Sequence, residues 1–313
     1  MAHPDPGAGT GPLLPASGSQ GRRSRWRRSA VAAGVLVALV GGWAIARRND
    51  DARRPAATSS SAGSTTPLTS ASPIPGTGVR ASFVPAGAYD RLPAPLPLAG
   101  TGSAVVLFGD SLVLQAYPYA TDIARARGYR LTGGAYGGLA LCDELASISG
   151  ALRATRPAVL VLGFVGNAIT PCMTRDGGAA SPASIAARYA RDARRAIAAA
   201  NAVGADVWFV IPPVMRAPDR NAVALSLAAR WQAIADSTPH VRVLDTAHLF
   251  GGPRFSARVA CLPFETAALG CHNGSVVVRA ADGTHLVPPD AAQYSPGAWR
   301  YAEVLVGGLA PRR

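Results

Sequence analysis

The stretch "SAVVLFGDSLVLQAY", residues 103–117, decides the fold of this chain. Residues 104–108 are five apolar residues with the composition of a buried strand. Gly109, Asp110 and Ser111 end that strand, and a helix-compatible segment follows. An acid and a hydroxyl at such a junction either cap the helix or belong to a functional site, because sites in parallel sheets gather at the carboxyl ends of strands. The tripeptide taken alone favours the helix cap.

Four more strand-like runs follow, with helical patterns between them. They occupy residues 129–133, 158–164, 205–211 and 241–245. The clearest helical pattern, residues 182–200, has an apolar face that includes Ile185, Tyr189 and Ile197 and an opposite face of arginines. Continuous apolar strands that alternate with helices predict a parallel sheet covered on both faces. We therefore expect one α/β domain over residues 101–313.

The N-terminal part of the chain determines the expected location. Residues 29–46 form an uncharged, mostly apolar stretch of 18 residues, just long enough to cross a bilayer core of about 30 Å as a helix. The arginines before it and the tryptophans near its ends favour a transmembrane signal anchor, with residues 1–28 as a disordered, basic cytoplasmic tail. The alternative is a signal peptide cleaved near Ala46, because "AIA" at residues 44–46 resembles a cleavage site. In either case the domain is expected to be extracytoplasmic, on a single-pass cell-membrane protein or a secreted one.

Composition predicts a linker between the membrane and the domain. Residues 47–100 are rich in Ala, Pro, Ser, Thr and Gly, and such a segment buries too little apolar surface to offset its chain entropy. We expect this linker to be disordered. The net charge of +13 raises the question of nucleic acid. The arginines are spread over the N-terminal part and over helix faces, without a basic stripe interleaved with aromatic residues, so no nucleic-acid partner is expected.

A serine nucleophile needs a general base, and the base usually needs a group that orients it. Of the five histidines, His285 is the best candidate, because it stands in "VVVRAADGTHLVPP" with Asp282 three residues before it. In a loop this spacing lets the carboxylate turn back onto the imidazole N–H, and Gly283 between them supplies the turn. Taken alone, the pair also fits an ordinary surface turn.

Stabilisation of a tetrahedral oxyanion needs donors that are held in place. The N–H of Ser111, at the expected start of a helix, is one candidate. The segment "GGAYGGLALCD" follows the second strand and offers Gly137 and Gly138, and "GFVGNAITPC" follows the third strand and offers Asn167. Three strand ends and one late loop therefore each supply one part of a serine-hydrolase site.

These blocks, taken in order, resemble the SGNH/GDSL hydrolase family over about residues 102–307. The first block is "GDSL" at residues 109–112, and the last is "DGTH" at residues 282–285. The family's glycine block is best matched by Gly138 and its asparagine block by Asn167. The resemblance implies a three-layer α/β/α sandwich of flavodoxin-like type with a five-stranded parallel sheet.

The resemblance also implies a role for each residue. Ser111 would be the nucleophile, and Asp282 and His285 would complete the triad. The N–H groups of Ser111 and Gly138 and the Asn167 amide would form the oxyanion hole.

The sequence departs from the family pattern in two places. The third block reads "GNA" where many members have G-x-N-D, and the first block lacks the small residue that often follows shortly after the serine. The segments "AYGGLALCD" and "FVGNAITPC" are most similar to an actinobacterial extracytoplasmic, membrane-anchored branch. That branch is akin to domains fused to membrane acyltransferases of envelope glycans.

The four cysteines suit disulfides, because their number is even and the domain is expected to be exported. They are Cys142, Cys172, Cys261 and Cys271. None forms a C-x-x-C pair, so no structural zinc site is expected. Three pairings are open. We prefer Cys142–Cys172 with Cys261–Cys271, because the first bridge would tie together the loops that carry Gly138 and Asn167.

The expected function is that of a serine esterase or acyl-transfer enzyme acting on O-acyl esters of envelope glycans or glycolipids, without cofactor or metal. The expected partners are an acylated glycan or lipid substrate and the membrane through residues 29–46, and a membrane acyltransferase is a further candidate. One alternative is a non-catalytic module that binds envelope glycan or protein on the same scaffold. A secreted lipase or thioesterase is another.

Overall fold

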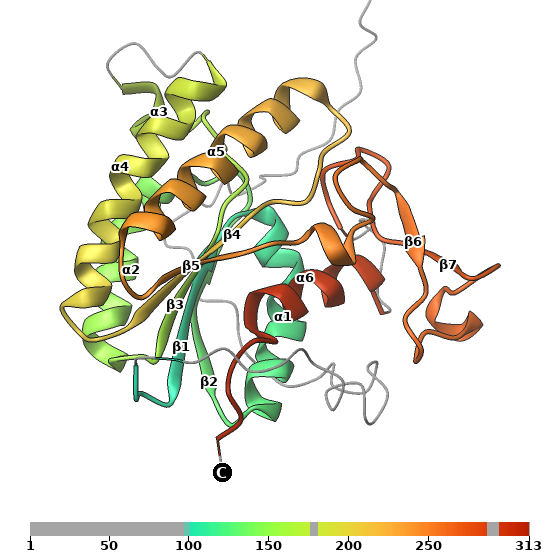
Figure 1. Cartoon of the computed structure of the whole chain (residues 1–313), viewed down its shortest axis with the longest axis horizontal. Coiled ribbons are helices and arrows are strands. Elements are labelled where there is room, and N and C mark those ends of the chain that lie inside the picture. Colours follow the sequence, from blue (N-terminus) through green and yellow to red (C-terminus); the bar gives the residue numbers. More distant parts are fainter. Residues whose placement is uncertain (1–97, 99, 176–180, 287–293, 313) are drawn as a thin grey trace, which may run out of the picture. The chain divides into compact units, whose positions relative to one another are not determined.

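The computed structural model describes residue 98 and residues 100–175, 181–286 and 294–312. Its centre is a five-stranded sheet in which all neighbouring strands run parallel, in the order β2-β1-β3-β4-β5 (Figure 1). The strands are β1 (Ala104–Gly109), β2 (Arg130–Ala135), β3 (Val159–Gly163), β4 (Asp206–Val210) and β5 (Val241–Leu244). Each falls on one of the five predicted runs. The order is that of a flavodoxin-like doubly wound sheet, as expected.

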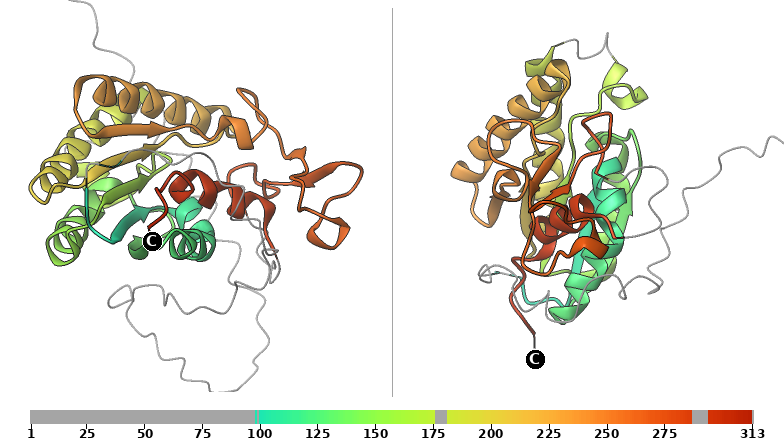
Figure 2. Two further views of the ribbon diagram at one scale, coloured as in Figure 1. Left: turned by 60° about the horizontal axis from the view of Figure 1, so that its bottom comes forward. Right: turned by 90° about the vertical axis from the view of Figure 1, so that its right-hand side faces the viewer.

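Helices cover both faces of this sheet, which confirms the three-layer arrangement (Figure 2). They are α1 (Ser111–Ala126), α2 (Leu141–Thr155), α3 (Pro171–Thr174), α4 (Pro182–Asn201), α5 (Pro218–Ser237) and α6 (Pro296–Val306). Helices α1 and α6 lie on one face, and α2, α4 and α5 lie on the other. The predicted helix over residues 182–200 is α4, and its apolar residues Ile185, Tyr189 and Ile197 are buried.

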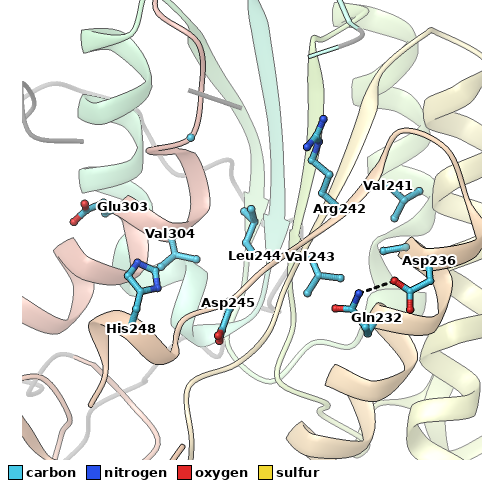
Figure 3. Close-up of a pocket in the computed structure, with 12 residues that line it drawn as sticks. Gln232, Asp236, Val241, Arg242, Val243, Leu244, Asp245, His248, Glu303 and Val304 are labelled. Carbon is cyan, nitrogen blue, oxygen red and sulfur yellow. Dashed lines mark hydrogen bonds between the residues drawn. The ribbon is translucent and has the colours of Figure 1, made fainter. Parts of the chain in front are cut away.

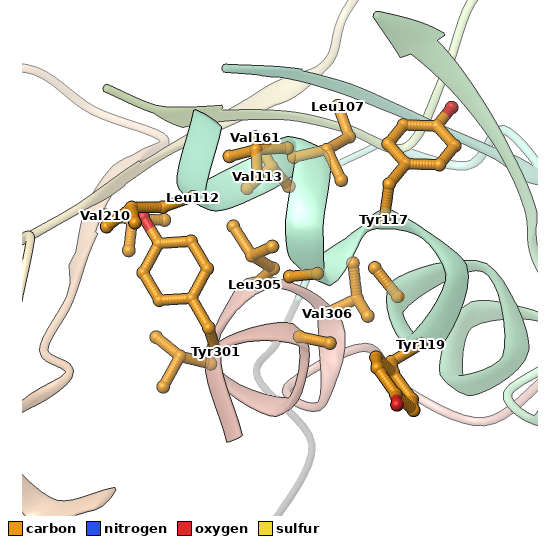
Figure 4. Close-up of a cluster of buried hydrophobic side chains, with 14 of the residues drawn as sticks. Leu107, Leu112, Val113, Tyr117, Tyr119, Val161, Val210, Tyr301, Leu305 and Val306 are labelled. Carbon is orange, nitrogen blue, oxygen red and sulfur yellow. The ribbon is translucent and has the colours of Figure 1, made fainter. Parts of the chain in front are cut away.

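Alternating side chains of each strand feed two separate hydrophobic cores. Leu107 of β1 points into the core beneath α1 and α6, whereas Phe108 points into the core beneath α2, α4 and α5. In the first core, Tyr301 of α6 reaches across toward Leu112 of α1 and Val210 of β4 (Figure 4). This core holds the first turn of α1 against the ends of β1 and β3, which is where the predicted nucleophile lies.

A short two-stranded antiparallel sheet follows β5, and the sequence patterns did not predict it. It pairs β6 (Arg258–Ala260) with β7 (Ser275–Val277) and lies beyond α6 (Figure 1). Three residues per strand are too few for a recognisable alternation. The segment is joined to the main body by a fully buried ion pair between Glu265 and Arg300 of α6.

Both preferred disulfides are confirmed. Cys142 is bonded to Cys172 with their Cα atoms 6.1 Å apart, and Cys261 is bonded to Cys271 at 5.9 Å. The first joins the start of α2 to α3. The second closes a loop between β6 and β7.

The predicted tail, anchor and linker fall almost entirely outside the described residues, which begin at Leu98. Among the residues that the structure does describe, no helix combines the length and the apolar character needed to cross a bilayer.

Candidate active site

The first strand ends in glycine because there is no room for a side chain at that point. A Cβ atom on Gly109 would lie 2.2 Å from Cγ2 of Val113 and 2.3 Å from the carbonyl oxygen of Gly163. Only a residue without a side chain lets β1 approach both β3 and the first turn of α1 this closely. Ser111 is therefore presented as the first residue of α1, where free N–H groups and the helix dipole favour negative charge.

Asp110 is buried, where it caps α1 and holds the loop after β3, and it is not accessible to a substrate. Its Oδ1 accepts the N–H of Leu112 at 3.2 Å, and its Oδ2 accepts the N–H of Val165 at 2.6 Å. Asp110 thus joins the end of β1 to the loop after β3. Burial raises the pKa of its carboxyl to about 7, although these hydrogen bonds and the nearby His285 act in the opposite direction. The prediction that the tripeptide caps the helix is therefore confirmed for Asp110, and the Ser111 side chain is left free for another role.

The structure brings Ser111, His285 and Asp282 together. The Nε2 atom of His285 lies 3.1 Å from Oγ of Ser111, across 174 positions of sequence. Its Nδ1 atom is hydrogen-bonded to Oδ2 of Asp282. With Nδ1 donating to the carboxylate, Nε2 is the free acceptor for the serine proton. This is the geometry of a nucleophile, a general base and an orienting acid.

Asp282 is ionised at neutral pH. Burial tends to raise the pKa of its carboxyl, but hydrogen bonds from the His285 ring and from the backbone N–H groups of His285 and Thr284 outweigh burial and lower it to about 2. Its Oδ1 accepts the Thr284 N–H at 2.8 Å and the His285 N–H at 2.9 Å. The carboxylate is therefore held by its own turn while the other oxygen orients the imidazole.

The turn between the acid and the histidine depends on Gly283, as predicted. Gly283 has φ +69°, and a Cβ there would lie 2.4 Å from Cβ of Arg216. Nη1 of Arg216 donates to the carbonyl of Ala281 at 2.7 Å, and its backbone N–H donates to the carbonyl of Gly283 at 3.2 Å. Sequence reasoning missed Arg216, because nothing in its local pattern shows that the loop after β4 meets this turn.

Arg279 is a second residue that sequence reasoning missed. It is buried, and its Nη2 donates to the carbonyl of Val214 at 3.0 Å, in the same loop after β4. Burial lowers the pKa of its guanidinium to about 10, so it remains a cation at neutral pH. Arg279 and Arg216 together fix the turn that carries Asp282 and His285.

The predicted glycine loop lies beside Ser111. A Cβ on Gly137 would be 3.9 Å from Cβ of Ser111, and Gly138 has φ +81°. Among the described residues, no backbone oxygen accepts a hydrogen bond from the Gly138 N–H. The Ser111 N–H is the first of its helix and has no partner within it. Both N–H groups thus remain candidate oxyanion donors.

Asn167 is near these groups, but its amide already has partners. Nδ2 donates to the carbonyl of Leu139 at 3.2 Å and to Oδ2 of Asp110 at 3.3 Å. The Tyr189 hydroxyl donates to the backbone carbonyl of Asn167 at 2.9 Å. The side chain therefore lies between the glycine loop and the end of β1. To stabilise an oxyanion, the amide would exchange one of these acceptors for the substrate oxygen, and that role stays a prediction.

The Cys142–Cys172 bridge joins α2 and α3, the helices that directly follow the loops of Gly138 and Asn167. The bridged sulfurs and the Asp143 carboxylate lie within 4.8 Å of one another. A disulfide sulfur is not the thiolate that metals bind, so we assign no metal to this cluster. Asp143 instead accepts the Ala140 N–H at 2.8 Å at the start of α2.

A groove of about 590 Å³ lies at the β5 edge of the sheet (Figure 3). Gln232 and Asp236 of α5 line one side of it, and Glu303 and Val304 of α6 line the other. None of the predicted site residues lines this groove. Burial raises the pKa of the Glu303 carboxyl to about 7, against the opposing effect of Arg300.

No family model and no curated protein sequence matches the chain. Several solved structures are similar to it. The C-terminal catalytic domain of Streptococcus pneumoniae peptidoglycan O-acetyltransferase A covers 66% of this chain and 91% of its own, with 14% identity and a TM-score of 0.40. An Enterococcus faecalis lipase/acylhydrolase covers 67% and 98%, with 17% identity and a TM-score of 0.43. An acetylxylan esterase from Geobacillus stearothermophilus covers 49% and 80%, with 13% identity and a TM-score of 0.39.

Proposed function

We propose that this chain is a serine esterase or acyl-transfer enzyme of the SGNH/GDSL type. The observation that carries the proposal is the contact chain from Asp282 through His285 to Ser111, with 3.1 Å between Nε2 and Oγ. A hydroxyl placed at a helix N-terminus and hydrogen-bonded to an oriented imidazole is an activated nucleophile.

The proposed reaction starts with attack by the Ser111 oxygen on an ester carbonyl. His285 takes the serine proton at Nε2, and the ionised Asp282 stabilises the imidazolium that forms. His285 then returns the proton to the leaving alkoxide. The acyl group passes from Ser111 to water, or to a sugar hydroxyl in the case of transfer.

The tetrahedral intermediate carries a negative charge that needs donors. The N–H groups of Ser111 and Gly138 are the proposed donors, and the Asn167 amide is the third. Each fixed donor of this kind contributes about 10²–10³-fold to turnover. The Cys142–Cys172 bridge supports this proposal, because it restrains the relative positions of the glycine and asparagine loops.

For the substrate we propose the O-acyl esters of cell-envelope glycans or glycolipids. The proposal rests on the expected extracytoplasmic location, with residues 29–46 as membrane anchor, and on the resemblance of the sequence blocks. A membrane acyltransferase is the proposed partner in the case of transfer.

Ser111→Ala tests the proposal directly. We expect at least about 10³-fold slower hydrolysis of a small aryl acetate and no labelling by a fluorophosphonate, because the nucleophile is gone. Ser237→Ala is the matched control, since Ser237 is an exposed serine at the end of α5 and should keep full activity. Undiminished hydrolysis by Ser111→Ala would remove Ser111 from the mechanism. Absence of labelling in the oxidised wild-type chain would favour a non-catalytic binding module.

A lipase or thioesterase is the second candidate, and two exposed apolar side chains favour it. Leu114, one turn of α1 beyond Ser111, is 38% exposed, and Ile169, two residues after Asn167, is 83% exposed. Together they could contact a longer acyl chain at the rim of the site. A preference for aryl octanoate over aryl acetate in kcat/KM would favour this candidate, and the reverse preference would favour short acyl esters.

A further inference from the structure

Gln115 connects the nucleophile's helix to the loop of the general base. Its Oε1 accepts the backbone N–H of Leu286 at 2.9 Å, across 171 positions of sequence. A backbone N–H needs an acceptor, so the amide oxygen, and not the amide nitrogen, faces Leu286. Gln115 is four residues after Ser111, which places both side chains on the same stripe of α1.

Leu286 directly follows His285, so a hydrogen bond to the Leu286 N–H also restrains the residue that carries the imidazole. The Leu286 side chain is buried, and its carbonyl accepts the Ser295 hydroxyl at 3.4 Å. The His285 carbonyl accepts the Ala280 N–H at 2.7 Å. The peptide group between His285 and Leu286 is therefore held at both polar atoms, its carbonyl by the Ala280 N–H and its N–H by Gln115.

The geometry points to Gln115 as a positioning residue that sets the distance between the His285 imidazole and the Ser111 hydroxyl. We propose this role on the basis of the proposed function. The Gln115 side chain fastens the base loop to the helix that carries Ser111, one turn after Ser111 itself.

Gln115 is expected to affect turnover because proton transfer from Ser111 to His285 depends strongly on the relative position of the two side chains. Misplacing a reacting group by about 1 Å can reduce turnover by about 10²-fold. Without the Gln115 oxygen, the Leu286 N–H loses its acceptor, and only the turn, the buried Leu286 side chain and the long Ser295 hydrogen bond hold the imidazole against Ser111. Substrate contacts are unchanged, so the loss should be in kcat and not in KM.

Three variants of the full chain test this inference. Gln115→Leu keeps the approximate shape and removes the acceptor, and we expect kcat to fall about 10- to 100-fold with KM within twofold. Gln115→Glu keeps an acceptor oxygen and should recover most of kcat above the acid limb of the pH profile. Its carboxylate favours the imidazolium, so the acid limb of kcat/KM should shift to higher pH. Gln232→Leu is the matched control, because Gln232 is an exposed helical glutamine that bonds Asp236 far from the triad.

Hydrogen exchange at the Leu286 amide tests the contact without using activity. Exchange should be faster in Gln115→Leu than in wild type, and Gln115→Glu should restore protection. Wild-type kcat in Gln115→Leu, or an equal loss in Gln115→Leu and Gln115→Glu with no shift of the acid limb, would overturn the positioning role. Full activity in Ser111→Ala would instead overturn the proposed function, so the two failures are distinguishable.

Discussion

Asp110 is a buried carboxyl that shapes the surroundings of Ser111, the proposed nucleophile, and it has no proposed role in the reaction itself. It is fully buried and holds the N–H groups of Leu112 and Val165, so it fixes the end of β1 against the loop after β3. Burial also disfavours the ionised form of the carboxyl. We therefore expect the contribution of Asp110 to the stability of the fold to depend on pH.

We expect Asp110→Asn to flatten the dependence of stability on pH between about 4 and 7. The pKa of Asp110 is about 7 in the folded chain against 3.8 for the free group, so the folded state binds its proton more tightly. Its stabilising contribution is full below pH 4 and is lost as pH rises to 7. At about 1.4 kcal/mol for each unit of pKa difference, the loss is on the order of 4 kcal/mol. Chemical denaturation of both forms at pH 4.5 and pH 7.5 measures it, and identical pH slopes in wild type and variant would contradict the expectation.

At the scale of elements, the proposed active site consists of loops that the sheet and the disulfide hold together. The glycine loop after β2 and the asparagine loop after β3 leave neighbouring strand ends on either side of β1 and its Ser111. The Cys142–Cys172 bridge closes 30 residues, whereas Cys261–Cys271 closes 10 residues of the β6–β7 segment. The two bridges should therefore have different consequences when removed.

We expect Cys142→Ser/Cys172→Ser to lower kcat about 10-fold, because the loops that carry Gly138 and Asn167 lose their mutual restraint. By loop-closure entropy, the bridge also contributes about 3–4 kcal/mol to the free energy of unfolding. Cys261→Ser/Cys271→Ser is the matched control, with about 2–3 kcal/mol of stability lost and kcat within threefold. Steady-state kinetics and urea unfolding of both double variants separate the effects. A larger loss of kcat in the control would show that the β6–β7 loop, and not the first bridge, positions the site.

At the scale of the whole molecule, α6 is the last helix and follows the loop of His285, the last of the proposed catalytic residues. It packs beside α1 over one face of the sheet, and its Arg300 pairs with Glu265 from the β6–β7 segment in a fully buried contact. The Tyr294 hydroxyl donates to the same carboxylate at 3.0 Å. One ion pair thus ties the segment between β5 and the His285 loop to the C-terminal helix.

We expect Arg300→Met to cost about 3–5 kcal/mol, because it leaves the Glu265 carboxylate buried without its cation. Arg300→Met with Glu265→Gln should recover much of that loss, since neither charge then remains. Urea unfolding at pH 7 measures both, and kcat below the unfolding transition should stay within threefold. A double variant no more stable than the single variant would contradict this account of the pair.

Local physics explains which parts of the fold could be predicted. The five strands and α4 follow from hydrophobic period, and the Asp282–Gly283–Thr284–His285 turn follows from a glycine that adopts φ +69°. The β6–β7 pair could not be predicted, because its strands are three residues long. The state of the Asn167 amide depends on the Leu139 carbonyl and Asp110, which no local pattern connects.

The sequence by itself determined the five strands of the main sheet, helix α4 and the residue types at the strand ends, because period and turn chemistry act over a few neighbouring residues. Only the tertiary structure decided that Nε2 of His285 meets Oγ of Ser111 and that Gln115 holds Leu286. These contacts join positions 174 and 171 residues apart, and they form because Leu112 of α1 and Leu286 of the base loop are buried in the same hydrophobic core. Arg216 and Arg279 became visible for the same reason, since their acceptors are backbone oxygens of loops remote in sequence.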